Sequence, residues 1–207
     1  MNKTIQTYSQ IYQAYADRNT LNENIKPLLN KFIKLLKGKK IIDVGCANGR
    51  DSCYFYSQGY NVTGIDLSPE FIKLAEESCP KVKFKLMDMR ALKFKPNSFD
   101  GMWACASFLH IPKKEALQTL IGFRKVIKTS GVLFLSVMEG DFEGYRKHDQ
   151  LKWGDRYFSH YKTIELEKLF VDAGFDVIEL IKTPTSWGPV FLNYYCKANK
   201  SPKPHPH

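Results

Sequence analysis

Residues 41–49 read IIDVGCANG, an apolar run that ends in an acid and is followed by a turn of small residues. A helix-like segment from Arg50 to Gln58 and a second strand from Tyr60 to Ile65 come next, and Asp66 follows that strand. Small residues let the backbone come close to a ligand, and the first N–H groups of a helix point toward it. An acid at the end of the second strand can accept hydrogen bonds from ribose hydroxyls. The stretch therefore predicts a nucleoside-binding strand–helix–strand unit.

The spacing of the small residues indicates which nucleoside the loop suits. The dinucleotide fingerprint G-x-G-x-x-G requires a glycine or alanine at position 50, where this chain has Arg50. The small residues fall instead at Gly45, Ala47 and Gly49, which argues against a pyrophosphate ligand. An ordinary turn in another three-layer α/β fold would look the same, so the loop by itself leaves that alternative open.

At this loop the chain resembles the class I S-adenosylmethionine-dependent methyltransferases, whose first motif is an acid, one residue and then G-x-G-x-G. Asp43 matches the acid, and Ala47 replaces the middle glycine. Later segments match the family in order and at similar intervals over roughly residues 8–197. These segments are a third strand at Val82–Leu86, a fourth strand at Ser98–Cys105 that begins with "SFD", a fifth strand at Gly131–Met138, and a last helix at Thr163–Ala173 followed by Gly174-Phe175.

The resemblance implies an α/β, Rossmann-like three-layer sandwich with a seven-stranded, mostly parallel sheet whose last strand is antiparallel. It divides the chain into an N-terminal helical cap over residues 1–38, a donor-binding domain over 39–197 and a disordered tail over 198–207. The spacing of apolar residues predicts two helices within residues 5–37. Residues 139–162 are expected to form a functional loop, since loops of that length are uncommon in compact domains.

The same resemblance implies that S-adenosyl-L-methionine binds as the methyl donor and leaves as S-adenosyl-L-homocysteine. Asp66 is then expected to bind the ribose, and Asp88 and Met89 to lie around the adenine. Gly49 is expected to let the backbone approach the donor. The full set of expected donor-binding residues is Tyr15, Asp43, Gly45, Cys46, Ala47, Asn48, Gly49, Asp66, Leu67, Asp88, Met89, Ala104 and Ser107.

The chemistry of methyl transfer suggests the catalytic candidates. Much of the catalysis can come from holding the nucleophile, the methyl group and the sulfur in line, and a base helps when the acceptor is a hydroxyl or a neutral nitrogen. His110, just after the fourth strand, is the best-placed titratable group. His160 and Tyr161, just before the last helix, are second candidates. A structural role stays open for all three residues.

Four further residues are candidates for binding the acceptor. Tyr8 and Tyr12 share helical spacing with Tyr15, a pattern that suits either a lid over the site or packing in the core. Arg146 and Arg156 lie in the expected loop, where they would either hold an anionic group of the acceptor or remain solvated.

Length and composition are consistent with one compact unit. The chain has 207 residues and 43% hydrophobic content, enough to bury one sizeable core. It contains no run of eighteen apolar residues and no apolar signal core near Met1, so we expect a cytoplasmic protein without a membrane span, as a monomer or homodimer. The five cysteines are odd in number and lack C-x-x-C spacing, which predicts packing roles and no metal site.

The net charge of +10 raises the question of a nucleic-acid partner. Lysines alternate along residues 81–85, a pattern typical of a solvated edge strand. The segment after the fourth strand, Ala106–Leu109, lacks the acceptor loop of amino-directed DNA methyltransferases. The Pro-Cys nucleophile of cytosine-C5 enzymes and the glutamate pair of arginine methyltransferases are also missing.

The favoured function is therefore methyl transfer to an oxygen or nitrogen atom of a small-molecule or peptide acceptor, with nucleic acid possible but not favoured. One alternative is a tRNA-modifying enzyme similar to the wobble-uridine methyltransferases, which the excess of lysine supports. Another is a catalytically silent donor-binding subunit of a larger assembly. The acids and glycines of the donor-binding motifs are intact, which argues against this last alternative.

If the positive charge lies on solvated faces, tRNA should bind weakly at physiological salt and without preference among tRNAs. The reason is that phosphate contacts without base contacts carry no sequence information. Filter binding of several tRNAs over a salt series measures this. Tight, tRNA-selective binding that persists at high salt would favour the RNA-modifying alternative.

Overall fold

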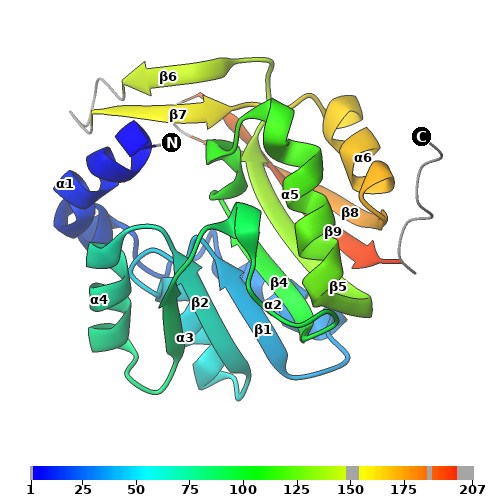
Figure 1. Cartoon of the computed structure of the whole chain (residues 1–207), viewed down its shortest axis with the longest axis horizontal. Helices are drawn as coiled ribbons and strands as arrows, with labels where there is room; N and C mark the ends of the chain where they lie inside the picture. Colours follow the sequence, from blue (N-terminus) through cyan, green and yellow to red (C-terminus); the bar gives the residue numbers. More distant parts are fainter. Residues whose placement is uncertain (1, 148–153, 186–187, 200–207) are drawn as a thin grey trace.

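A computed structural model describes residues 2–147, 154–185 and 188–199, which are organised by a seven-stranded sheet (Figure 1). Its strands lie in the order β3-β2-β1-β4-β5-β9-β8. Strands β1 to β5 pair in parallel, and β9 is antiparallel to both of its neighbours. The expected Rossmann-like sheet with an antiparallel last strand is confirmed. The strand bounds are β1 (Lys40–Val44), β2 (Asn61–Asp66), β3 (Lys83–Leu86), β4 (Phe99–Cys105), β5 (Ile127–Met138), β8 (Phe175–Pro184) and β9 (Val190–Ala198).

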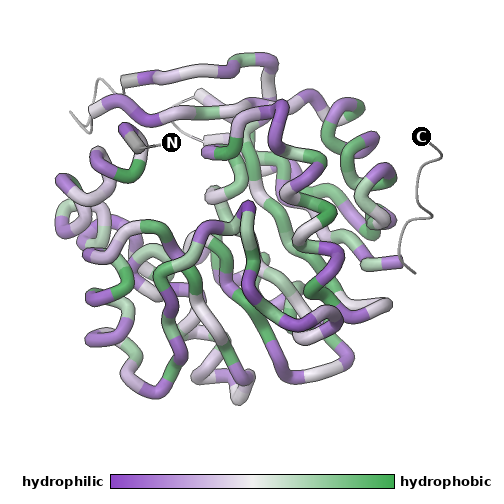
Figure 2. Tube along the Cα trace, in the orientation of Figure 1, coloured by the Kyte–Doolittle hydropathy of each residue, from purple (hydrophilic) through white to green (hydrophobic). Residues whose placement is uncertain are grey.

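Helices cover both faces of the sheet. One apolar core forms between the sheet and α5 and α6, through residues such as Leu120 and Phe170. The other forms between the sheet and α2 and α3, through residues such as Phe32 and Phe55. Figure 2 shows the resulting hydrophobic strands between more hydrophilic outer segments. The bounds are α1 (Asn2–Arg18), α2 (Lys26–Leu35), α3 (Arg50–Ser57), α4 (Pro69–Ser78), α5 (Lys113–Val126) and α6 (Thr163–Asp172), with 3-10 turns η1 (Met89–Ala91) and η2 (Phe108–His110).

The sequence explains where the central elements begin and end. Ile41, Ile42 and Val44 are fully buried because β1 has a helix layer on each side, so the strand reads as a continuous apolar run. Helix α4 begins at Ser68, whose hydroxyl accepts the Phe71 N–H at 3.3 Å. Strand β3 is an edge strand with exposed lysines, as its alternation predicts.

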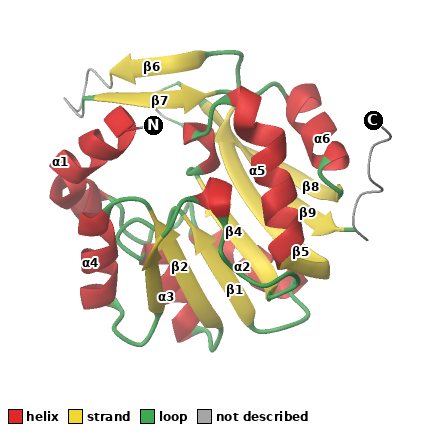
Figure 3. Cartoon of the chain, viewed as in Figure 1, coloured by secondary structure: helices red, strands yellow, loops and turns green. Residues whose placement is uncertain are grey.

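The expectation that residues 139–162 form a loop is wrong. The segment contains β6 (Glu143–Lys147) and β7 (Asp155–Ser159), which pair antiparallel as a separate two-stranded sheet (Figure 3). Tyr145 and Tyr157 lie directly opposite each other, with ring centroids 5.4 Å apart. Such cross-strand aromatic pairs stabilise a hairpin whose strands are too short to be recognised from alternation alone.

The two N-terminal helices occupy different positions. Helix α2 belongs to the core, since Leu29 and Phe32 are fully buried against the sheet. Helix α1 lies across the carboxyl end of the sheet, beside α4 and β7 (Figure 1). A domain boundary at residue 38 remains a prediction. The expected tail falls mostly on residues 200–207, which lie outside the described residues, and Ala198 is the last residue of β9.

Gly49 lies against the protein core. Its φ is +79°, and a Cβ there would lie 3.0 Å from the Ala75 Cβ and 3.1 Å from the Phe84 Cζ. A packing requirement between α3, α4 and β3 therefore favours glycine at this position, and the close approach of its backbone to the donor stays a prediction.

Gly59 provides a matched control, because it has the same φ of +79° and nothing within 4 Å of a Cβ. Both Gly49→Ala and Gly59→Ala should lose stability from the left-handed backbone. Gly49→Ala should lose about 1–3 kcal/mol more, because its methyl group overpacks a tight contact. Urea denaturation of both variants measures the difference, and equal losses would show that α4 yields at no cost.

Candidate functional site

The loop between β1 and α3 turns at the carboxyl end of the sheet. Gly45, Ala47 and Gly49 all have positive φ, at 73°, 46° and 79°. A Cβ at Gly45 would lie 2.3 Å from the Ser107 Cβ, so glycine is required there. Ala47 occupies the left-handed region with a side chain, which explains why the family's usual residue at this position is glycine.

Asp66 joins this loop to the end of β2. Its Oδ2 accepts the Ala47 N–H at 3.0 Å, and its Oδ1 accepts the Ser68 N–H at 2.9 Å. Burial raises the pKa of Asp66, and the N–H groups of Ser68, Ala47 and Leu67 oppose that shift. Each carboxylate oxygen keeps accepting capacity for a ligand hydroxyl.

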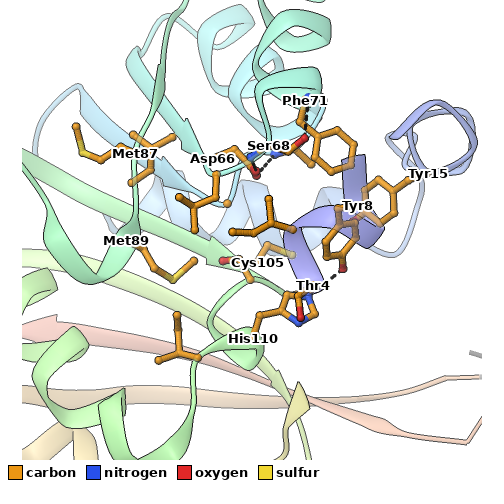
Figure 4. Close-up of a pocket in the computed structure, with 18 residues that line it drawn as sticks. Thr4, Tyr8, Tyr15, Asp66, Ser68, Phe71, Met87, Met89, Cys105 and His110 are labelled. Carbon is orange, nitrogen blue, oxygen red and sulfur yellow. Dashed lines mark hydrogen bonds between the residues drawn. The ribbon is translucent and has the colours of Figure 1, made fainter. Parts of the chain in front are cut away.

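A cavity of about 740 Å³ opens beside this loop and beneath α1 (Figure 4). Asp66 and the Gly45–Ala47 turn form one side of it, and apolar side chains such as Met87, Met89 and Phe71 form much of the rest. Tyr8 and Tyr15 reach into it from α1. The cavity has the mostly apolar lining that is typical of small-molecule sites.

A second cavity, of about 840 Å³, lies on the α2 side of the loop and shares its lining at Tyr15, Gly45, Ala47, Cys105 and Ala106. Arg50 forms two hydrogen bonds to Asp51, at 2.7 and 2.8 Å, and the Trp103 indole donates to Asp51 at 2.8 Å. Burial and the nearby Asp51 raise the pKa of Asp43, which also lines this cavity. A guanidinium and two carboxyl groups therefore lie next to the loop.

The structure brings most of the expected donor-binding residues together. Tyr15, Gly45, Ala47, Asp66, Leu67, Met89 and Ser107 line the first cavity. Asp43 and Cys46 line the second. The other four expected donor-binding residues, which the structure also describes, line neither cavity: Asn48, Gly49, Asp88 and Ala104.

Local contacts account for two of these four positions. Asn48 accepts a hydrogen bond from the Asn19 side chain at 2.7 Å. Asp88 caps η1 and forms an ion pair with Arg90 at 2.5 Å. That ion pair holds the pKa of Asp88 low against the effect of burial.

Three side chains from α1, η2 and β7 meet at one end of the first cavity. The Tyr8 hydroxyl lies 2.9 Å from His110 Nε2, and Arg156 Nη1 donates to the Tyr8 oxygen at 3.0 Å. His110 Nδ1 lies 2.6 Å from the Tyr157 carbonyl oxygen. A carbonyl only accepts, so Nδ1 carries the proton and Nε2 accepts from Tyr8. Burial lowers the pKa of His110 to about 4, so the ring is neutral at neutral pH.

The remaining catalytic and acceptor candidates lie elsewhere. Five of these candidates, all within the described part of the chain, line neither cavity: Tyr12, Arg146, Arg156, His160 and Tyr161. Tyr161 is fully buried in the core, and the His160 backbone pairs with Phe142 at 2.8 Å. Arg146 and Arg156 lie opposite each other in the hairpin. Arg156 is buried on β7, against which α1 packs, whereas Arg146 on β6 is exposed.

Several lining residues carry no signal in the sequence. Thr4 and Ile5 reach the first cavity only because α1 folds back over the sheet, and Cys105 lines both cavities where packing alone was expected. Arg50 was notable only for breaking the dinucleotide fingerprint, yet it lines the second cavity. Met87 could have been found, since it alternates with Met89 around Asp88.

Two classes of feature are absent from the described part of the chain. Within it, no three or more His, Cys, Asp or Glu side chains are grouped so as to hold a metal ion. No helix there has the length and apolar character needed to cross a membrane.

Comparison with known proteins relates part of the chain to a methyltransferase family. Residues 41–131 match the family described as "Methyltransferase domain", a range that covers the loop, Asp66 and His110. The match places a methyltransferase domain in this part of the chain.

Two curated relatives match about half of the chain. The chain is 35% identical over 103 residues to the 2-methyl-6-phytyl-1,4-hydroquinone methyltransferase of Synechocystis sp., a match that covers 48% of this chain and 32% of that protein. It is 32% identical over 108 residues to a ubiquinone biosynthesis O-methyltransferase of Xanthomonas campestris, covering 50% and 44% of the two chains. The matches therefore span less than half the length of these curated relatives.

A solved structure of this fold covers nearly the whole chain. It is the crystal structure of the 1,6-didemethyltoxoflavin-N1-methyltransferase of Burkholderia thailandensis, with bound 1,6-didemethyltoxoflavin and S-adenosylhomocysteine. The TM-score is 0.75 at 23% identity, covering 95% of this chain and 87% of that one. At this identity the likeness extends to the fold.

Asp66→Ala should weaken the binding of S-adenosylhomocysteine by roughly 2–4 kcal/mol, because it removes charge-assisted hydrogen bonds to the ribose and releases the Ala47 N–H. Asp100→Ala is the control, since Asp100 lies at the opposite end of the sheet, where it accepts the Lys40 N–H at 2.9 Å. Calorimetric titration of both variants measures the change. Unchanged affinity in Asp66→Ala would place the ribose elsewhere.

Proposed function

We propose that this protein transfers a methyl group from S-adenosyl-L-methionine to an oxygen or nitrogen atom of a small-molecule or peptide acceptor. The observation that carries the proposal is the composition of the first cavity. Asp66 and the Gly45–Ala47 turn lie on one side of it, and the Tyr8–His110 pair lies at the end under α1. Groups suited to the donor and groups suited to an acceptor therefore share one cavity.

The residues around the loop fit an adenosyl group. Gly45 leaves room where any Cβ would collide with Ser107, and Asp66 offers carboxylate lone pairs at the end of β2. Leu67, Met87 and Met89 provide an apolar wall suited to a purine. When bound there, the donor supplies an electrophilic methyl group on a positively charged sulfur.

Helix α1 supplies the cover that methyl transfer needs. The Thr7 hydroxyl donates to the Asp155 carbonyl at 2.8 Å, and the Thr4 hydroxyl accepts the Tyr157 N–H at 2.9 Å. Both threonines are buried, so α1 is hydrogen-bonded along the edge of β7. The Tyr8 and Tyr15 rings on this helix lie edge to face, with centroids 5.5 Å apart, and aromatic faces of this kind attract a cation.

The acceptor end of the cavity favours a largely apolar molecule with one polar group. Ile5 and Ile111 line it together with Tyr8 and His110. The names of the similar proteins support this class, since they refer to a hydroquinone, to ubiquinone biosynthesis and to didemethyltoxoflavin. An O–H or N–H group of such an acceptor would find a hydrogen-bond partner at the Tyr8–His110 pair.

Incubation with S-adenosyl-L-methionine labelled on its methyl group, together with fractionated small-molecule, peptide and RNA extracts, tests the proposal. We expect label in a small-molecule or peptide fraction and none when Asp66→Ala replaces the wild type. Label in RNA would favour the RNA-modifying alternative. Donor binding without label in any fraction would indicate a silent donor-binding subunit.

A further inference from the structure

We propose that Tyr8 and His110 form a proton relay for the methyl acceptor, and that Arg156 positions Tyr8 and does not bind the acceptor. Tyr8 would take the acceptor's proton as its own proton passes to His110 Nε2. This inference rests on the proposed function, and it reassigns Tyr8 and Arg156, both of which the sequence suggested as acceptor-binding residues.

The hydrogen bonds of Tyr8 leave one position for the acceptor. A phenol oxygen donates once and accepts twice. Tyr8 donates to His110 Nε2 across 2.9 Å and accepts from Arg156 Nη1 across 3.0 Å. The remaining lone pair belongs to an oxygen whose side chain lines the first cavity. An O–H or N–H of the acceptor can donate to that lone pair.

The orientation of His110 is set by its surroundings. Nδ1 is held by the Tyr157 carbonyl at 2.6 Å, which directs Nε2 toward Tyr8. The imidazole also contacts the Tyr8 and Phe158 rings, with centroids 5.4 and 5.0 Å away. His110 is therefore locked with its accepting nitrogen at the end of the relay.

Arg156 lies behind Tyr8. Its guanidinium carbon is 5.3 Å from the Tyr8 ring centroid and 5.2 Å from that of Phe158, and the residue is 5% exposed. It does not line either of the cavities formed by the described residues. An anionic group of an acceptor in the first cavity would meet Tyr8 before it met Arg156.

The step balances as follows. A lone pair of the acceptor oxygen or nitrogen forms the new bond to the methyl carbon, and the electron pair of the broken carbon–sulfur bond stays on sulfur. The acceptor's proton moves to the Tyr8 oxygen, and the Tyr8 proton moves to His110 Nε2. Sulfur loses its positive charge as the imidazole gains one, so the net charge of the closed site is unchanged. The loss of the charge on sulfur compensates for the nearby Arg156 guanidinium, which would otherwise oppose a charged imidazole.

Helix α1 assembles the relay. The helix that carries Tyr8 is held on β7 by the Thr4 and Thr7 hydroxyls and by the ion pair of Lys3 with Asp155 at 2.5 Å. The same contacts therefore cover the cavity and place Tyr8 beside His110.

The first test reads the proton positions directly, whether or not an acceptor is turned over. Two-bond proton–nitrogen spectra of protein labelled with 15N-histidine should show His110, assigned with His110→Asn, as the neutral Nδ1–H tautomer at pH 7 with S-adenosylhomocysteine bound. Tyr8→Phe should shift the Nε2 resonance toward that of a free imidazole nitrogen, whereas Tyr12→Phe on the same helix should not. An Nε2–H tautomer, or no shift in Tyr8→Phe, would overturn the relay.

The second test separates catalysis from packing, with catechol and the more acidic 4-nitrocatechol as probe acceptors. Tyr8→Phe and His110→Asn should each lower kcat for catechol by about 10²-fold, with unchanged affinity for S-adenosylhomocysteine. The double variant should lose no more than either single variant, since the two residues act as a unit. The losses should shrink for 4-nitrocatechol, which ionises by itself. Equal losses for both probes, or full kcat in Tyr8→Phe, would overturn the proposal.

Arg156→Lys distinguishes positioning from acceptor binding. If Arg156 only holds Tyr8, the variant should lower kcat and leave KM for catechol unchanged. A raised KM with unchanged kcat would show that Arg156 binds the acceptor. A shift of the His110 Nε2 resonance in the same variant is expected, because Tyr8 loses one of its two partners.

Discussion

The hydrogen bond from the Ala47 N–H to the Asp66 carboxylate joins the carboxyl ends of two neighbouring parallel strands. It holds a turn in which three small residues have positive φ, a conformation that a free chain would not maintain. This conformation also requires glycine at position 45, which packs against Ser107, and at position 49, which packs against α4. Both cavities share this turn, so their linings depend on this contact together with the hydrogen bonds from the Gly45 and Cys46 N–H groups to the Ile65 carbonyl.

The chemistry of the site depends on burial as much as on residue type. His110 in water would be partly charged near neutral pH, but burial lowers its pKa to about 4 and leaves it a neutral acceptor. Burial also raises the pKa of Asp66, although backbone N–H groups compensate part of that effect. The same helix that covers the cavity brings Tyr8 to His110, so this hydrogen-bonded pair exists only in the folded protein.

Local patterns predicted the parallel sheet well because they are strong in this chain. A buried strand such as β1 has a continuous apolar run, and Ser68-Pro69 marks the start of α4 with a cap and a preset φ. The β6–β7 hairpin escaped prediction because its stability comes from pairing across strands, including the Tyr145–Tyr157 contact. The packing of Gly49 against α4 was also not predicted, since a glycine's need for space does not reveal which side is crowded.

The sequence by itself determined the order of the elements, the strand–turn–helix loop and the acid at the end of β2, because each depends on residues close together in the chain. Only the tertiary structure decided which candidates share a site. His110 and His160 are equally good bases as residues, and Arg146 and Arg156 lie opposite each other on one hairpin. The packing of α1 against β7 and η2 brings His110 to the first cavity beside Tyr8 and buries Arg156 behind Tyr8, and that contact joins segments separated by more than a hundred residues.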